Sequence, residues 1–103
     1  MARFTRTQVI LKMAESGMIP VFYNSDPEVC KQVISACYKG GVRLFEFTNR
    51  GAYAHLVFEE INKWAAVEYP DLIMGTGSVI DAPTAILYAQ LDSNFIVSPL
   101  LNE

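Results

Sequence analysis

The sequence is poor in the residues that bind metals and nucleic acids. It has one histidine, His55, and two cysteines, Cys30 and Cys37, too few for an obvious set of metal ligands. Its 8 basic residues are outnumbered by 11 acidic ones, so the net charge is −3 and no basic stripe is available for nucleic acid or anionic lipid. We therefore expect no bound metal and no nucleic-acid partner.

Long apolar runs are also missing. Glycine, proline or a charge interrupts each run within a few residues, so none reaches the length of a membrane span. The opening segment MARFTRTQVILKMAESG spaces its apolar residues as a helix does and includes Lys12 and Glu15, which argues against a signal peptide. Cys30 and Cys37 fall on one predicted helix, and two buried thiols are typical of a reducing compartment. These features predict a cytoplasmic protein with no membrane partner.

The sequence has instead an alternation of short apolar runs and amphipathic segments. Hydrophobic residues make up 51% of the chain, which is enough for one domain with a core. The predicted strands are MIPVFY at 18–23, VRLFEFT at 42–48, DLIMGTGS at 71–78 and NFIVSPLL at 94–101.

Predicted helices precede the first strand and fill the intervals between the others. Most have a start or stop signal: Ser25 or Asp26 as one N-cap, Asp81 as another, Gly17 as a C-terminal stop and Pro70 as a terminator. The predicted helices cover about 5–15, 26–40, 53–69 and 81–91.

This order predicts an α/β protein of the TIM, or (β/α)8, barrel family. Strands separated by helices pair in parallel with right-handed crossovers. The strands begin roughly every 25 residues, close to the repeat of such a barrel. The chain would supply an N-terminal helix and about the first four strands, as a single partial domain over residues 1–103.

The segment GVRLFEFTNRG, residues 41–51, is apolar on both faces of the predicted strand, yet it contains a glutamate. Because side chains alternate along a strand, Glu46, Thr48 and Arg50 are predicted to face the barrel interior. Phe45 and Phe47 would face the helices. Polar residues at the ends of the other strands would join the first group on one rim: Asn24, Thr76, Ser78 and Ser98.

These residue types can support chemistry on a small molecule. A carboxylate in an apolar barrel can have a raised pKa and exchange protons near neutral pH. Arg50 offers a bidentate clamp for a carboxylate or phosphate, and the glycines of GTGS let a ligand approach the backbone closely. A structural interpretation is also open, with Glu46 and Arg50 as a buried ion pair and GTGS as an ordinary strand-to-helix turn.

Three segments, GGVRLFEFTNRG, IMGTGSVIDAPTA and NFIVSPLLNE, resemble a known family in order and spacing. They are similar to the first half of the 2-dehydro-3-deoxyphosphogluconate aldolases, which also cleave 4-hydroxy-2-oxoglutarate, and the resemblance covers nearly the whole chain from about Ile10. It implies a lyase, a class I aldolase on a (β/α)8 barrel. Such an enzyme is typically a trimer and releases pyruvate and an aldehyde from a keto-acid substrate without a metal or organic cofactor.

The resemblance also implies roles for individual residues. Glu46 would move protons, Arg50 and Ser78 would hold the pyruvyl carboxylate, and Pro99 would line the pocket. The family's Schiff-base lysine lies beyond the equivalent of SPLLNE. The lysines present here fall on predicted helices or at a helix end: Lys12, Lys31, Lys39 and Lys63.

The sequence therefore predicts a partial aldolase barrel with two unpaired sheet edges, which is inactive alone. It would be a piece of a longer aldolase, or it would pair with copies of itself or with a complementing C-terminal half. The alternative interpretation is a non-catalytic, oligomerising α/β module that contains a structural Glu46–Arg50 ion pair.

Overall fold

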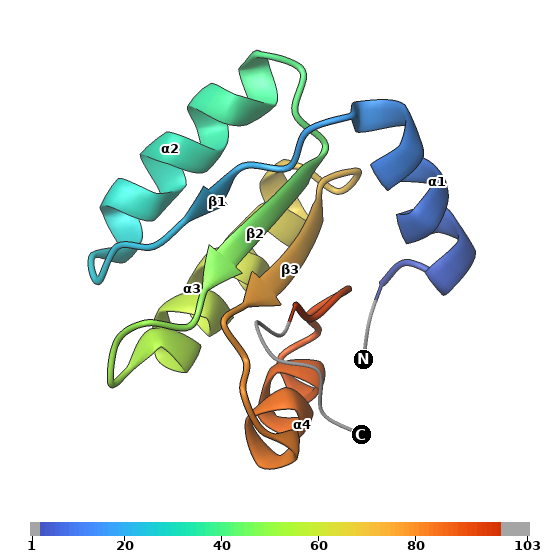
Figure 1. The fold of residues 1–103 in the computed structure, drawn as a ribbon. Helices are drawn as coiled ribbons and strands as arrows, with labels where there is room; N and C mark the ends of the chain where they lie inside the picture. The colour runs from blue at the N-terminus through green and yellow to red at the C-terminus, as the bar shows by residue number, and fades with distance from the viewer. Residues whose placement is uncertain (1–2, 98–103) are drawn as a thin grey trace.

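Three short parallel strands form the centre of the fold, as the computed structural model shows for residues 3–97, the part of the chain that the structure describes (Figure 1). Helices alternate with the strands, as predicted. The elements are α1 (Arg6–Ser16), β1 (Val21–Phe22), α2 (Pro27–Lys39), β2 (Leu44–Thr48), α3 (Ala54–Glu68), β3 (Ile73–Gly77) and α4 (Ala82–Gln90). The strand order is β1-β2-β3.

Most helix ends follow the predicted capping residues, and the capping box of the first helix was not predicted. Thr5 and Gln8 form a capping box at the start of α1, and Gly17 ends this helix in the left-handed region with a φ of 66°. Asp26 and Asp81 accept backbone hydrogen bonds at the starts of α2 and α4. All four predicted helices are confirmed among the described residues, with bounds shifted by about one residue.

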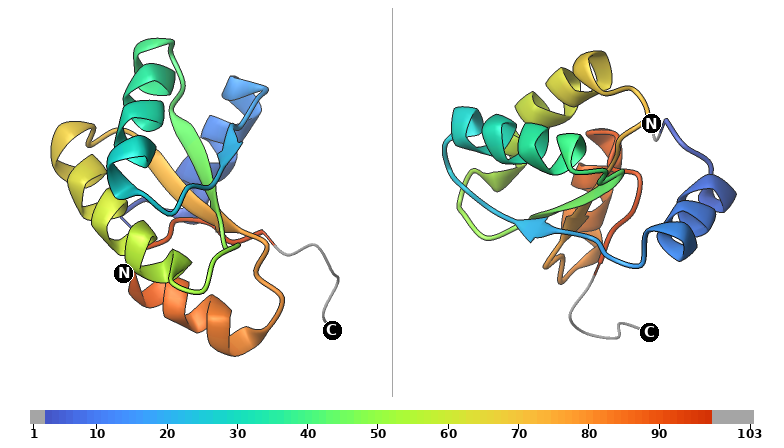
Figure 2. Two further views of the ribbon diagram at one scale, coloured as in Figure 1. Left: turned by 90° about the vertical axis from the view of Figure 1, so that its left-hand side faces the viewer. Right: turned by 90° about the horizontal axis from the view of Figure 1, so that it is seen from above.

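Helices lie on both faces of the sheet, and they divide unequally between them. Helices α2 and α3 lie on one face, and α1 lies on the other (Figure 2). Phe45 and Phe47 are fully buried in the cluster beneath α2 and α3, as predicted. We call the opposite face the inner face; it is formed by Leu44, Glu46 and Thr48 on β2 and by Ile73 on β3.

Helix α1 covers only the N-terminal part of the inner face. Val9 of α1 packs with Leu44 and Ile73, which are buried there together. Phe95, from beyond α4, packs against the same cluster. The burial removes apolar surface from water and fixes α1 on the sheet. Towards the carboxyl ends of the strands, the inner face carries Glu46 instead of an apolar side chain.

The strand register places specific residues beside Glu46. Val21 of β1 lies opposite Glu46 on one side, and Gly75 of β3 lies opposite it on the other. Thr48 and Gly77 are register partners at the carboxyl ends of β2 and β3. The inner face around Glu46 is therefore flanked on the β3 side by positions without side chains.

The first and last predicted strands are less regular than expected. The predicted strand 18–23 contains only the two-residue β1. Residues 94–97 follow β3 in parallel through a single bridge, Thr76 to Ile96, with hydrogen bonds from the Thr76 N–H to the Phe95 carbonyl and from the Val97 N–H to the Thr76 carbonyl. The remainder of this predicted strand, including Ser98 and Pro99, lies outside the described residues. Within residues 3–97, no helix is long and apolar enough to cross a membrane.

Candidate active site

Glu46 is the one charged side chain of strand β2, and it lies half-buried on the inner face. Its carboxyl group extends across to β3 and lies against the backbone of Gly77. A methyl group at Gly77 would overlap Oε2 of Glu46 and would lie 2.7 Å from Cδ and 3.2 Å from Cγ. Within residues 3–97, no hydrogen bond or ion pair holds this carboxyl group. Among the described residues, the carboxyl group of Glu46 is therefore held mainly by packing against the backbone of β3.

Burial raises the pKa of the Glu46 carboxyl above its ordinary value, because desolvation disfavours the charged form. Burial is the cause of this shift, and no hydrogen bond or ion pair from residues 3–97 counteracts it. A carboxyl group with a raised pKa is a better proton acceptor and a better proton donor near neutral pH. This is the chemical property that the sequence predicts for Glu46.

The two glycines of β3 serve a purpose that the sequence interpretation missed. Neither Gly75 nor Gly77 has a positive φ, so backbone conformation does not require glycine at either position. A methyl group at Gly75 would overlap the ring of Phe95, just as one at Gly77 would overlap Glu46. The signal was present in the sequence as glycines two residues apart in a strand, which places both on one face.

Arg50 does not pair with Glu46. It lies two residues beyond the end of β2, and its N–H donates to the Thr48 carbonyl at 3.0 Å, so the chain turns here. Side-chain alternation therefore does not extend from Glu46 to Arg50, and the Arg50 side chain is exposed. The prediction of a structural Glu46–Arg50 ion pair is wrong for the described residues, which contain no such pair.

Ser78 follows directly after β3 at the same edge of the sheet as Glu46 and Arg50. It is exposed, and its φ of 57° puts a non-glycine residue in the left-handed region. A residue held in this region is uncommon and often marks a turn with a functional purpose. The remaining predicted site residue, Pro99, lies outside the described residues.

Two further polar residues predicted on this rim serve the scaffold. Thr76 is fully buried on the helix-covered face, and its hydroxyl lies 3.1 Å from the Ser93 hydroxyl. Asn24 accepts the Asp26 N–H at 2.8 Å and so shapes the turn before α2. Thr48 does lie on the inner face, where its hydroxyl is buried without a partner among the described residues.

The lysines of the chain all lie on helices. Three of them pair with glutamates: Lys12 with Glu15, Lys31 with Glu28 and Glu60, and Lys63 with Glu59. Lys39 is the last residue of α2. The bonds to Glu60 and Glu28 raise the pKa of Lys31, whereas a lysine that attacks a carbonyl needs a lowered one. The prediction that these lysines lie on helices, with Lys39 at a helix end, is confirmed.

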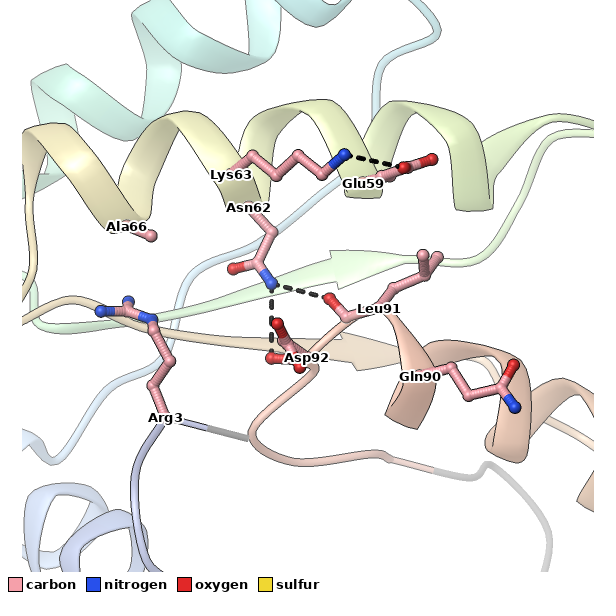
Figure 3. A pocket seen from close by; sticks show the side chains of 8 residues that line it. All are labelled: Arg3, Glu59, Asn62, Lys63, Ala66, Gln90, Leu91 and Asp92. Carbon is pink, nitrogen blue, oxygen red and sulfur yellow. Dashed lines mark hydrogen bonds and ion pairs between the residues drawn. The ribbon is translucent and has the colours of Figure 1, made fainter. Parts of the chain in front are cut away.

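A pocket of about 300 Å³ lies at the other end of the sheet, between α3 and the turn after α4 (Figure 3). Asn62 donates to the Leu91 and Asp92 carbonyls at 2.9 and 3.3 Å. Arg3 donates to the carbonyls of Pro70 and Leu72, just before β3. These bonds fasten the turn and the N-terminal segment to the scaffold. One acceptor, Oδ1 of Asn62, is buried without a partner among the described residues.

Residues 3–97 include no group of three or more histidine, cysteine, aspartate or glutamate side chains placed to hold a metal ion. The residue best suited to take part in a reaction is the half-buried Glu46, which lies next to the backbone of Gly77 at the carboxyl edge of a parallel sheet. In α/β folds this edge is where small ligands bind. Fold and geometry together make Glu46 of this α/β protein the candidate proton-transfer group among the described residues.

Comparison with known proteins gives the family. A model of the KDPG and KHG aldolase family matches residues 9–103, nearly the whole chain. The chain belongs to the KDPG and KHG aldolase family, as the sequence resemblance predicts. A search of curated proteins found no match.

Solved structures of aldolases have the same fold. The 2-keto-3-deoxy-6-phosphogluconate aldolase of Zymomonas mobilis ZM4, solved with 3-phosphoglycerate, is 26% identical with a TM-score of 0.78; the match covers 95% of this chain and 44% of that one. The enzyme of Z. mobilis ATCC 29191 is 28% identical with a TM-score of 0.70, over 82% of this chain and 38% of that one. The KDPG aldolase of Legionella pneumophila, with pyruvate captured as a covalent carbinolamine, is 25% identical with a TM-score of 0.71, and the match covers 82% of this chain and 39% of that one. The chain thus spans less than half the length of these relatives.

Proposed function

We propose that this chain forms the first part of a class I aldolase that cleaves 2-keto-3-deoxy-6-phosphogluconate or 4-hydroxy-2-oxoglutarate to pyruvate and an aldehyde. The observation that carries the proposal is Glu46: a half-buried, unpaired carboxyl group with a raised pKa, at the sheet edge where α/β enzymes bind ligands. Membership of the aldolase family supports the same reaction.

The fold proposed for the active enzyme is a (β/α)8 barrel, to which this chain contributes about four strands. The parallel sheet with intervening helices and the 38–44% coverage of the relatives support this proposal. At the free edge of β1, Val21 is 57% exposed although it lies beside Glu46. Pairing of this edge with further strands would cover Val21 and close the inner face around the carboxyl group.

The proposed reaction needs one nucleophile and one proton acceptor. A lysine condenses with the keto carbon of the substrate, and water leaves to form an iminium ion. Glu46 then accepts the proton of the hydroxyl at C4, the C3–C4 bond breaks, and its electron pair moves into the iminium to give an enamine and the free aldehyde. Glu46 returns the proton to C3, and hydrolysis of the resulting iminium releases pyruvate and restores the lysine.

Arg50, Ser78 and Pro99 would bind the substrate. Arg50 is exposed beyond β2, so its guanidinium is accessible to the carboxylate of a pyruvyl group. Ser78 is exposed at the end of β3, where its hydroxyl can donate to the same carboxylate. Pro99 would line the pocket. No metal or organic cofactor takes part in this proposal.

The lysine must come from outside the strands of this chain, because its own lysines lie on helices. The proposal is that the rest of the barrel supplies it, either as further chain or as a complementing C-terminal half. The active form would be a homo-oligomer, a trimer as in the resemblance, in the cytoplasm. The 103-residue chain alone is proposed to be inactive.

Borohydride reduction in the presence of pyruvate tests this proposal, with intact mass as the readout. The chain is treated alone and after co-purification with the C-terminal half of a family aldolase. We expect an adduct on the complementing half and none on this chain. An adduct on the 103-residue chain alone would overturn the assignment, because it would show that a helical lysine is the nucleophile.

A further inference from the structure

We infer that Gly77 is a positioning residue: its missing side chain creates the space in which the Glu46 carboxyl group lies across β3. The inference rests on the proposed function, because the positioned group is the proposed proton acceptor. The inference goes beyond the proposed function because it assigns a role to a residue without a reactive side chain.

The geometry distinguishes this role from the usual reasons for glycine. The φ of Gly77 is not positive, so an alanine at this position is not excluded by the backbone. The space above its Cα is nevertheless occupied, since Oε2, Cδ and Cγ of Glu46 are the three nearest atoms to an added methyl group. The distances of 2.7 Å to Cδ and 3.2 Å to Cγ are too short for the side chain to stay where it is.

The conflict falls on the flexible end of one side chain. The end of Glu46 can rotate away from β3 without moving the backbone, so an alanine at 77 should displace the carboxyl group and leave the fold intact. Solvent is the available destination, because Val21 on the neighbouring strand is 57% exposed and the Glu46 side chain is only half-buried. The carboxyl group would then lose the burial that distinguishes it from an ordinary glutamate.

Gly75 provides a matched control on the same strand and the same face. A methyl group at Gly75 meets the ring of Phe95 and no atom of Glu46 among its nearest neighbours. Gly75→Ala therefore crowds the inner face at the ring of Phe95, and the carboxyl group of Glu46 is not among the three nearest contacts of its methyl group. Any effect of general crowding appears in both variants, and an effect on Glu46 appears only in Gly77→Ala.

The test is a carbon-13 NMR titration of the glutamate carboxyl groups in the 103-residue chain. The Glu46 resonance is assigned by its loss in Glu46→Gln. We expect a pKa above the ordinary glutamate value in the wild type and in Gly75→Ala, and a shift towards the ordinary value in Gly77→Ala. An unchanged Glu46 titration in Gly77→Ala overturns the inference.

A second variant covers the case in which Gly77→Ala does not fold. Removal of the conflicting side chain in Gly77→Ala/Glu46→Ala should then restore folding, and a double variant that is still unfolded contradicts the inference. The titration uses no substrate. The positioning role can therefore fail while aldol chemistry is confirmed, or hold while aldol chemistry is disproved.

Discussion

The guanidinium of Arg43 lies over the ring of Tyr38, 3.7 Å from its centroid, and both side chains bind the carboxylate of Asp71. Arg43 also donates to the Tyr38 carbonyl at 3.0 Å. The cluster joins the end of α2 to the segment before β3, at the opposite end of the sheet from Gly77. It stabilises the scaffold that carries Glu46 without contributing to the site itself.

We predict that Arg43→Ala lowers the free energy of unfolding by about 1–2 kcal/mol, because the stacking contact and the hydrogen bonds to carbonyls are lost together. Arg43→Lys should recover only part of this, since an ammonium cannot reproduce the planar stacking. Urea unfolding followed by circular dichroism measures both. Equal stability of the wild type and Arg43→Ala would show that the cluster contributes nothing.

The same cluster predicts losses of stability at both ends of the pH range. The hydrogen bond from Tyr38 lowers the pKa of Asp71 in the folded state. The stability that Asp71 contributes is therefore present above its unfolded-state pKa and is lost as the pH falls through its folded-state pKa. The same bond raises the pKa of Tyr38 in the folded state. The stability that Tyr38 contributes is therefore present below about pH 10 and is lost as the pH rises through its folded-state pKa. In Tyr38→Phe, the melting temperature should depend less on pH in both windows. An unchanged pH profile would contradict the coupling.

Tyr88 ties α4 to the loop that leads into Arg50. Its fully buried hydroxyl donates to Oδ1 of Asn49 at 2.7 Å, and burial raises its pKa to about 12. Tyr88→Phe should cost about 1–2 kcal/mol, since Asn49 then loses the donor for its side-chain oxygen. Tyr69→Phe is the control, because Tyr69 is only partly buried whereas Tyr88 is fully buried, so loss of the bond from Tyr69 to Ser35 should cost less. Thermal unfolding at neutral pH compares the two variants, and a larger effect of Tyr69→Phe would refute the assignment.

Ser93 and Thr76 make an asymmetric pair. Ser93 donates to the Phe95 carbonyl at 2.8 Å, and its hydroxyl lies 3.1 Å from that of Thr76. Ser93→Ala leaves the Thr76 hydroxyl buried and unpaired, at a cost of about 1–3 kcal/mol, whereas Thr76→Val leaves Ser93 its carbonyl partner and should cost less. Denaturant unfolding of the two single variants and of the double variant tests this order. A larger cost for Thr76→Val than for Ser93→Ala would show that the Thr76 hydroxyl does not donate to Ser93.

Glu46 should reduce stability at neutral pH. Its folded pKa is raised by burial, so folding is favoured at pH values below the unfolded pKa, and this advantage is lost as the pH rises through the folded pKa. Glu46→Gln is therefore expected to be at least as stable as the wild type at pH 7 and to lose this part of the pH dependence. Glu68→Gln, an exposed position on α3, is the control. A marked destabilisation of Glu46→Gln would indicate a structural partner for the carboxylate.

The helix ends were predictable because their causes are local. Thr5, Asp26 and Asp81 act within three residues of themselves, and Gly17 acts through its own φ. Strand alternation correctly placed Phe45 and Glu46 on opposite faces.

The errors lie where alternation ends or where two strands meet. Arg50 was misplaced because the chain turns directly after Thr48, and Thr76 was misplaced because it shares the helix-covered face with Met74. The contact between Gly77 and Glu46 depends on the register of β2 and β3, which a single strand pattern does not reveal. Contacts between residues on neighbouring strands can be assigned only when the pairing register of the strands is known.

Exchange of the methyl protons of pyruvate with deuterated solvent tests the central claim, that Glu46 moves protons on an enamine whose lysine lies elsewhere in the barrel. Proton NMR follows the exchange with this chain and a complementing C-terminal half, in wild-type and Glu46→Gln forms. We predict exchange with the wild type, and in Glu46→Gln a borohydride-trapped adduct with little exchange. Exchange at the wild-type rate in Glu46→Gln, or none in the complemented wild type, would contradict the account.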